Sequence, residues 1–181
     1  GARAPSVRAN LARALLDAGR AEDVVDNSDL SLKNADLNAP AYRELAGIRA
    51  QALIATDQPD LARKVATDAV RAGPTTEARI ALASLAFRDD NDEGALQHLG
   101  KALEQDPDNV RARMMQARAF VQAGKLQEAM DALETARASS AGVGSPDLML
   151  VEVALRAGNS DRAWSVLAEL NERGAQDPRV Q

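Results

Sequence analysis

A small residue followed four positions later by an apolar or small residue recurs along this chain at a nearly constant distance. The motif occurs at Ala62-x3-Ala66, Ala95-x3-Leu99, Ala129-x3-Leu133 and Ala163-x3-Leu167. Successive copies begin 33, 34 and 34 residues apart. Two residues that are four positions apart lie on the same face of an α-helix. A helical motif that returns at this distance predicts an array of stacked helical hairpins.

A second helical segment precedes each copy of the motif and is separated from it by a short break. In the clearest pair, the pattern predicts a helix over 110–123, a turn at Gly124-Lys125 and a helix over 126–138. Gly124 suits the left-handed conformation that ends many helices. The same position in the other four pairs is taken by Gly19, Asp57, Asp90 and Gly158. The aspartates are weaker stops than glycine, but every pair has a residue that can end its first helix.

The first helices of the pairs share a further pattern of small and apolar residues. It is found at Leu11-Ala12-x2-Leu15, Arg49-Ala50-x2-Leu53, Leu82-Ala83-x2-Ala86, Gln116-Ala117-x2-Phe120 and Leu150-Val151-x2-Ala154. With the 34-residue distance, these positions resemble the tetratricopeptide repeat (TPR) family, whose unit is a helix-turn-helix. The resemblance implies an all-α fold, a right-handed superhelical solenoid (α-α superhelix) that forms a single array over residues 1–181. Its five units would span about 5–38, 39–74, 75–108, 109–142 and 143–176.

The chain departs from the family where a bulky aromatic residue is expected near the start of each first helix. The residues at that position are Arg8, Ala46, Arg79, Arg113 and Asp147. We expect looser packing there, or a cover provided by the aliphatic stems of arginines.

The first unit is irregular, because Val24 takes the place of the motif alanine and lies 38 residues before Ala62. A longer loop over 34–40, with a local kink, would absorb the four extra residues. The alternative is that the segment 26–36 frays and the second helix is short, since Asn27, Ser28, Asp29 and Ser31 are poor helix formers.

The last residues resemble the lead-in to another repeat, since Asp177-Pro178 echoes Asp106-Pro107. Terminal repeats usually need a polar outer face. We therefore expect a portion of a longer array, or a last face that a partner covers. One form of the second possibility is self-association through the uncapped helix over 162–173, with Trp164, Val166 and Leu167 exposed.

Composition removes several classes of function. The chain has no cysteine and one histidine, so a thiol nucleophile and a multi-histidine metal site are excluded, and we expect no catalytic residue, metal or cofactor. We expect His98 to be structural or on the surface. The net charge of −5 argues against nucleic acid as the partner. No apolar run approaches the roughly 18 residues that span a bilayer, so no membrane insertion is expected within this segment.

In the TPR family the first helices line a concave groove, and the resemblance assigns two groups of residues to it here. The apolar group is Ile54, Ile80, Phe87, Met114, Val121, Leu148 and Leu155, and the basic group is Arg88, Arg111, Arg118 and Arg156. An apolar strip beside arginines fits a protein or peptide ligand that is amphipathic and carries acidic residues. The alternative is that the apolar side chains only seal the gaps between adjacent first helices.

The function that follows is a noncatalytic protein–protein interaction scaffold or adaptor that binds a peptide or protein segment in the groove. The alanine-rich, arginine-rich and aromatic-poor repeats resemble bacterial arrays, which leaves both the bacterial cytoplasm and the periplasm open. A second reading is a repeat segment of a larger envelope, secretion or exopolysaccharide-export machine, or of a larger enzyme. A third is a self-association module.

Overall fold

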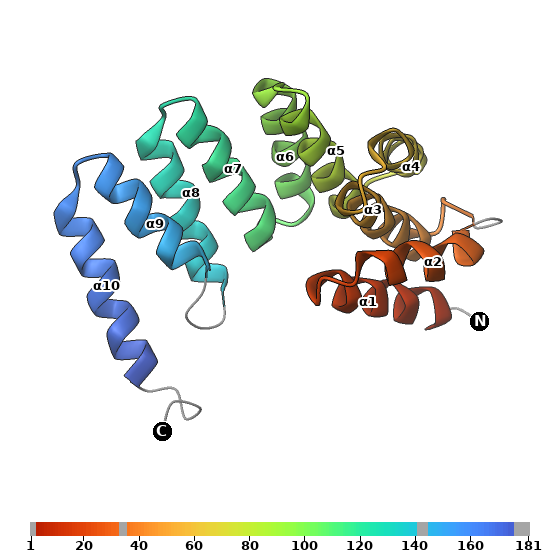
Figure 1. The fold of residues 1–181 in the computed structure, drawn as a ribbon, viewed down its shortest axis with the longest axis horizontal. Coiled ribbons are helices and arrows are strands. Elements are labelled where there is room, and N and C mark those ends of the chain that lie inside the picture. The colour runs from red at the N-terminus through yellow and green to blue at the C-terminus, as the bar shows by residue number, and fades with distance from the viewer. Residues whose placement is uncertain (1–2, 33–35, 141–144, 176–181) are drawn as a thin grey trace. The chain divides into compact units, whose positions relative to one another are not determined.

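Over the residues that the structure describes, the chain forms α-helices that pair as five helix-turn-helix hairpins (Figure 1). A computed structural model describes residues 3–32, 36–140 and 145–175, and no strand occurs within these ranges. The helices are α1 (Arg3–Asp17), α2 (Ala21–Leu32), α3 (Pro40–Ala55), α4 (Pro59–Ala72), α5 (Thr76–Arg88), α6 (Asp92–Gln105), α7 (Val110–Gln122), α8 (Leu126–Ser139), α9 (Ser145–Arg156) and α10 (Ser160–Ala175). The predicted all-α fold is confirmed, and the clearest predicted pair agrees with α7 and α8 to within one residue at each end.

All five predicted stops adopt the left-handed conformation. The φ angles are +74° at Gly19, +57° at Asp57, +56° at Asp90, +71° at Gly124 and +73° at Gly158. The next amide then reaches back to the helix, as the Gln58 N–H does to the Leu53 carbonyl at 2.8 Å. Aspartate occupies this conformation more readily than most residues, which is why it can replace glycine twice.

The second helix of the first hairpin does not end near residue 26, as the fraying alternative predicts, because α2 continues to Leu32. Two of its polar side chains bond within the helix: Ser28 Oγ donates to the Val24 carbonyl at 2.6 Å, and Asn27 Nδ2 donates to the Asp23 carbonyl at 2.6 Å. The fraying alternative is therefore wrong for residues 26–32, and residues 33–35 of that segment lie outside the described residues. Part of the predicted loop over 34–40 lies outside the described residues, and its last residue, Pro40, begins α3.

Arg43 ties this irregular junction to the next one. Its side chain is buried and donates to the carbonyls of Leu37, at 3.0 Å, and Pro74, at 3.3 Å. It also donates to the Asn38 carbonyl. One arginine thus satisfies backbone acceptors of two connections, the farther of which lies 31 residues away in the sequence.

The helices form two compact units, an N-terminal unit (Gly1–Asp106) and a C-terminal unit (Pro107–Gln181). In the N-terminal unit, α3 contacts α1, α2, α4 and α5, and α5 also contacts α4 and α6. Small side chains let the helices approach closely, and the motif residues Ala62 and Ala66 are fully buried. At Gly47, an added Cβ would lie 2.4 Å from the backbone nitrogen of Ala78, so α3 and α5 meet where only glycine fits.

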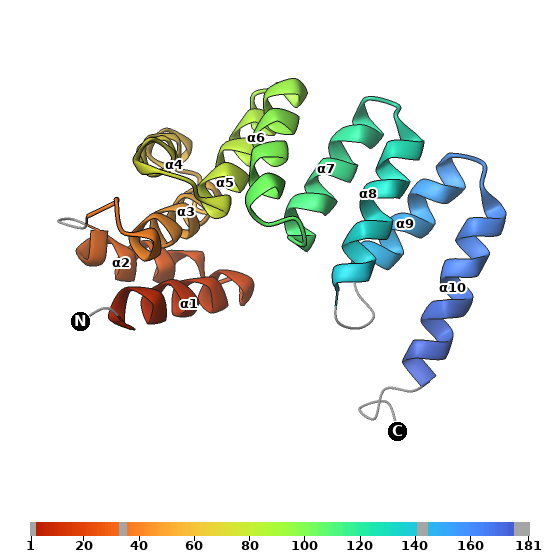
Figure 2. The ribbon, with the colours of Figure 1, turned by 180° about the vertical axis from the view of Figure 1, so that it is seen from behind.

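In the C-terminal unit, α8 packs against α7 and α9, and α9 also contacts α7 and α10 (Figure 2). The core contains Leu133, Leu150, Val153 and Val166, all at most 1% exposed. The expectation that Val166 is exposed on the last helix is wrong, since this side chain belongs to the core of the unit, whereas Trp164 and Leu167 lie outside it.

Candidate functional site

In the N-terminal unit, the first helices are joined by their own charges. Arg13 of α1 donates to Glu44 of α3 at 2.8 Å and to Glu77 of α5 at 2.6 Å. Gln51 Nε2 donates to Glu77 Oε2 at 2.6 Å, and Glu77 is buried. Burial acts to lower the pKa of Arg13, but the hydrogen bonds and charges of Glu77 and Glu44 outweigh it and raise the pKa. The face that was expected to hold a ligand is thus crossed by internal ion pairs.

Most of the predicted binding residues of this unit are buried or already paired within the chain. Ile80 is fully buried, so it packs the interior, while Ile54 and Phe87 are half-buried. Arg88 is exposed, but its guanidinium lies 2.7 Å from Asp57, the residue that ends the first helix of the preceding hairpin. These four predicted binding residues therefore offer little exposed apolar surface, and their one arginine is already paired.

In the C-terminal unit, the apolar side chains of the first helices reach solvent. Leu148 and Leu155 on α9 are 63% and 56% exposed. They lie seven positions apart, with the exposed Glu152 between them, and therefore share one face of the helix. On α7, Met114 and Val121 are half-buried and pack against the core of the unit. Here the predicted strip consists of two exposed leucines and two partly covered residues.

The predicted basic residues of this unit are exposed as well. Arg111 and Arg118 lie seven positions apart on α7, and Arg156 ends α9. Within the described residues, Arg118 and Arg156 make neither a hydrogen bond nor an ion pair, whereas Arg111 has an interaction partner. Among its described residues, the C-terminal unit therefore combines two exposed leucines with two exposed arginines, Arg118 and Arg156, that pair with no carboxylate.

A buried carboxylate in the same unit was not predicted. Asp147, at the position of the missing aromatic residue, is fully buried and accepts hydrogen bonds from Arg137 Nε, at 2.7 Å, and from Arg173. Arg137 also lies 2.6 Å from Glu169. Three helices, α8, α9 and α10, are joined in this way. The sequence did give a signal, because Asp147 replaces the aromatic residue expected at this position and arginines were expected to cover such positions.

The electrostatics of this network favour the charged forms of Arg137 and Glu169. Burial acts to lower the pKa of Arg137, but hydrogen bonds to Glu169 and Asp147 raise it. The hydrogen bond from Arg137 holds the pKa of Glu169 below its ordinary value, even though burial acts against it. Arg162 completes the cluster through Glu134 and Glu169. Because its charges are paired internally, the cluster is a structural element.

Other chemistry is sparse in the described part of the chain. His98 on α6 is half-buried, with Nδ1 3.3 Å from a guanidinium nitrogen of Arg79. Burial, and then the charge of Arg79, lower the pKa of His98. The described residues contain no group of three or more histidine or acidic side chains placed to hold a metal ion. None of the described helices is long and apolar enough to cross a membrane.

Helical hairpins with small residues at their contacts and left-handed stops define a helical-repeat protein. Models of the tetratricopeptide repeat match residues 5–25, 49–100 and 86–142. Together they cover more than half of the sequence, and the chain belongs to the TPR family. No curated protein sequence matches it.

Solved structures share the fold at low sequence identity. A crystal structure of MamA has a TM-score of 0.69 at 16% identity, covering 98% of this chain and 95% of that one. TTC0263, a TPR protein from Thermus thermophilus, has a TM-score of 0.69 at 21% identity, with coverage of 98% and 95%. YrrB, described as a TPR protein with an unusual peptide-binding site, has a TM-score of 0.60 at 17% identity, with coverage of 94% and 86%.

Proposed function

We propose that this chain is a noncatalytic protein-interaction scaffold whose C-terminal unit binds a peptide segment along α7 and α9. The observation that carries the proposal is the exposure of Leu148 and Leu155 on one face of α9. Burying apolar surface releases about 25 cal/mol per Å². A partner that covers both leucines gains that free energy at a place where the chain itself covers neither.

The exposed arginines of the same unit support a narrower proposal for the partner. Arg118 and Arg156 have no carboxylate partner among the described residues, and both are exposed. Acidic groups on a ligand would meet this charge, speed association and fix the register of binding. We therefore propose an amphipathic segment, with apolar anchors on one face and acidic residues beside them, bound as a helix in a groove. YrrB, with the peptide-binding site for which it is described, supports peptide recognition by this fold.

The test uses a synthetic, fluorescein-labelled helical peptide with leucines at positions i, i+4 and i+7 and glutamates between them, and a second peptide with lysines in place of the glutamates. Fluorescence anisotropy should show that the glutamate peptide binds and the lysine peptide does not. Replacing Leu148 and Leu155 with serine should weaken binding at least about tenfold, equivalent to about 1.4 kcal/mol. Arg118→Glu should also weaken binding, and added salt should do the same.

The matched controls lie in the N-terminal unit. Leu61 is 41% exposed on α4, so Leu61→Ser removes an exposed leucine elsewhere. Arg88→Glu reverses a charge that Asp57 already neutralises. Neither change should alter peptide binding. Equal binding of the two peptides, or full binding by the double serine variant, would rule out this surface as the site.

A further inference from the structure

The last helix exposes positions that the preceding second helix buries. Trp164 and Leu167 on α10 are 71% and 38% exposed. One 34-residue repeat earlier, the corresponding residues on α8 are Met130 and Leu133, which are 7% and 0% exposed. These two residues belong to the core that α8 forms with α9. The outer face of α10 thus corresponds to the face with which α8 contacts α9. On α10, no described helix covers that face.

The first helix exposes the complementary face. Val7 and Leu11 on α1 are 62% and 56% exposed. The position of Leu11 is taken on α9 by Leu150, which is fully buried in the same core as Met130 and Leu133. The position of Val7 is taken on α3 by Leu45, which is 2% exposed. The outer face of α1 therefore corresponds to the face with which α9 contacts α8.

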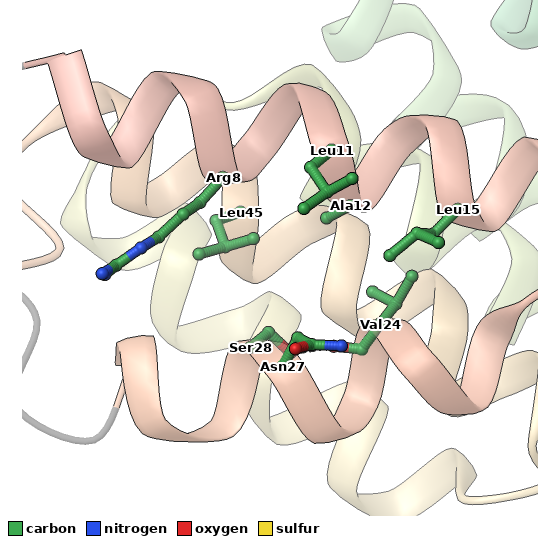
Figure 3. Close-up of a pocket in the computed structure, with 8 residues that line it drawn as sticks. All are labelled: Arg8, Leu11, Ala12, Leu15, Val24, Asn27, Ser28 and Leu45. Carbon is green, nitrogen blue, oxygen red and sulfur yellow. Dashed lines mark hydrogen bonds between the residues drawn. The ribbon is translucent and has the colours of Figure 1, made fainter.

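A pocket opens beside Leu11, between α1 and α2 (Figure 3). It has a volume of about 340 Å³, and Leu11, Leu15 and Val24 form its apolar wall. Figure 3 shows Leu15 and Val24 extending toward one another from the two helices. Pockets that hold small organic groups start at about 300 Å³. The pocket is therefore suited to one large aromatic side chain rather than to an extended ligand.

We propose that Trp164 of one copy inserts between α1 and α2 of a second copy, so that copies associate head to tail. The polar positions are compatible with this contact. Inside the chain, Arg137 of α8 meets Asp147 of α9. The corresponding residues at the two ends are Asn171 on α10 and Arg8 on α1, so at this pair an amide would face a guanidinium. Each copy uses two different surfaces, which makes the contact heterologous.

The first measurement uses the unaltered chain. Trp164 is its only tryptophan, so the emission spectrum reports on this side chain alone. As the protein concentration rises, light scattering should show a mass above the 19.2 kDa monomer, and the emission maximum should move to shorter wavelength as the indole leaves water. A constant monomer mass with unchanged emission over the concentration series would overturn the proposal.

Complementation between two variants separates a head-to-tail contact from a symmetric one. Leu11→Asp blocks the pocket and keeps Trp164, whereas Trp164→Ala keeps the pocket and removes the indole. Each variant alone should stay monomeric, and an equimolar mixture should form a 1:1 dimer. The only tryptophan in the mixture belongs to the Leu11→Asp copy, and its emission should shift as in the unaltered protein. Association of Leu11→Asp by itself, or a mixture that stays monomeric, would contradict the proposal.

Two controls keep the result interpretable. Leu61→Asp places the same charge on an exposed leucine of α4, outside the pocket, and should associate like the unaltered chain. Circular dichroism checks that each variant keeps its helix content. If Leu11→Asp unfolds α1, Leu11→Gln replaces it with the same expected outcome. The peptide-binding residues of α7 and α9 are intact in all of these variants, so the two proposals can fail independently.

Discussion

The two units are built from the same hairpin, but they place carboxylates differently around their arginines. In the N-terminal unit, Glu44 and Glu77 occupy one position of successive first helices and both bind Arg13. The corresponding positions of the C-terminal unit hold Arg111 and Ser145. A column of acids in one unit is thus replaced by an arginine and a serine in the other, and the repeat spacing is unchanged.

The turn residues differ in the same way. Arg88 pairs with Asp57, which ends the first helix of the preceding hairpin. Arg156 is two repeats further on from Arg88, and the residue that corresponds to Asp57 is Gly124. Both residues adopt the left-handed conformation, with φ angles of +57° and +71°. Only the aspartate supplies a negative charge. The backbone requirement of the fold therefore leaves the charge at this turn position free to vary.

The largest expected effect concerns Asp147 and Glu77, the two buried carboxylates among the described residues. Asp147 is fully buried between Arg137, which is 10% exposed, and Arg173. Removing one partner of a buried pair typically costs about 3–5 kcal/mol. Glu77 is also buried, but its partner Arg13 is 40% exposed and can be hydrated. Asp147→Ala should therefore lower the free energy of unfolding of its unit by about 3–5 kcal/mol, and Glu77→Ala by about 1–3 kcal/mol.

Hydrogen exchange in increasing urea measures this difference, because it assigns each loss of protection to its unit. Asp147→Ala should destabilise α8, α9 and α10, and Glu77→Ala should act on α1, α3 and α5. Glu172→Ala, at an exposed position of α10, is the control and should change little. Equal losses for the two variants would show that the exposure of the arginine partner does not matter.

A smaller effect is expected from placing a carboxylate at Gly124, where the N-terminal unit has Asp57. Gly124→Asp should allow Arg156 to pair as Arg88 does with Asp57, and so weaken binding of the glutamate peptide. A surface ion pair is worth about 0.2–1 kcal/mol, which corresponds to a loss of up to about fivefold. No atom lies within 4 Å of an added Cβ at Gly124, so the substitution has room. Anisotropy titrations measure the change.

Gly124→Asn is the matched control for this prediction. Asparagine tolerates the left-handed conformation as aspartate does, but it carries no charge. It should reproduce any effect on the stability of the turn and leave peptide affinity unaltered. Equal loss of affinity in the two variants would mean that the turn geometry, and not the charge of Arg156, determines binding.

The predictable part of this molecule is the part governed by backbone geometry and small size. Ala129 and Leu133 were placed in a helix contact by their period, and both are fully buried. Asp57 and Asp90 were identified as helix stops, and both have positive φ. These requirements are local or periodic, so they can be recognised in a single sequence.

The parts that escaped prediction depend on partners that are distant in the sequence. Arg137 and Arg173 meet Asp147 from two other helices, at separations of 10 and 26 residues. Periodicity alone does not show that Ile80 turns to the interior while Leu148 and Leu155 remain at the surface. At Ser28 the helix propensity was misleading, because its hydroxyl bonds to a carbonyl of its own helix.

The smallest expected effect is a difference in the pH at which each unit begins to lose stability. Burial and the charge of Arg79 lower the pKa of His98 in the N-terminal unit from its ordinary 6.5. The unfolded chain then binds a proton that the folded unit does not, so stability falls as the pH drops below about 6.5. In the C-terminal unit, Arg137 lowers the pKa of Glu169 from 4.5. The stability that this carboxylate contributes is therefore kept above pH 4.5 and lost as the pH falls through its pKa in the folded state.

Hydrogen exchange between pH 7.5 and 4 should show protection of α5 and α6 weakening first. His98→Gln should remove that first step and leave the C-terminal unit unchanged, whereas simultaneous weakening of both units above about pH 5 would contradict the assignment.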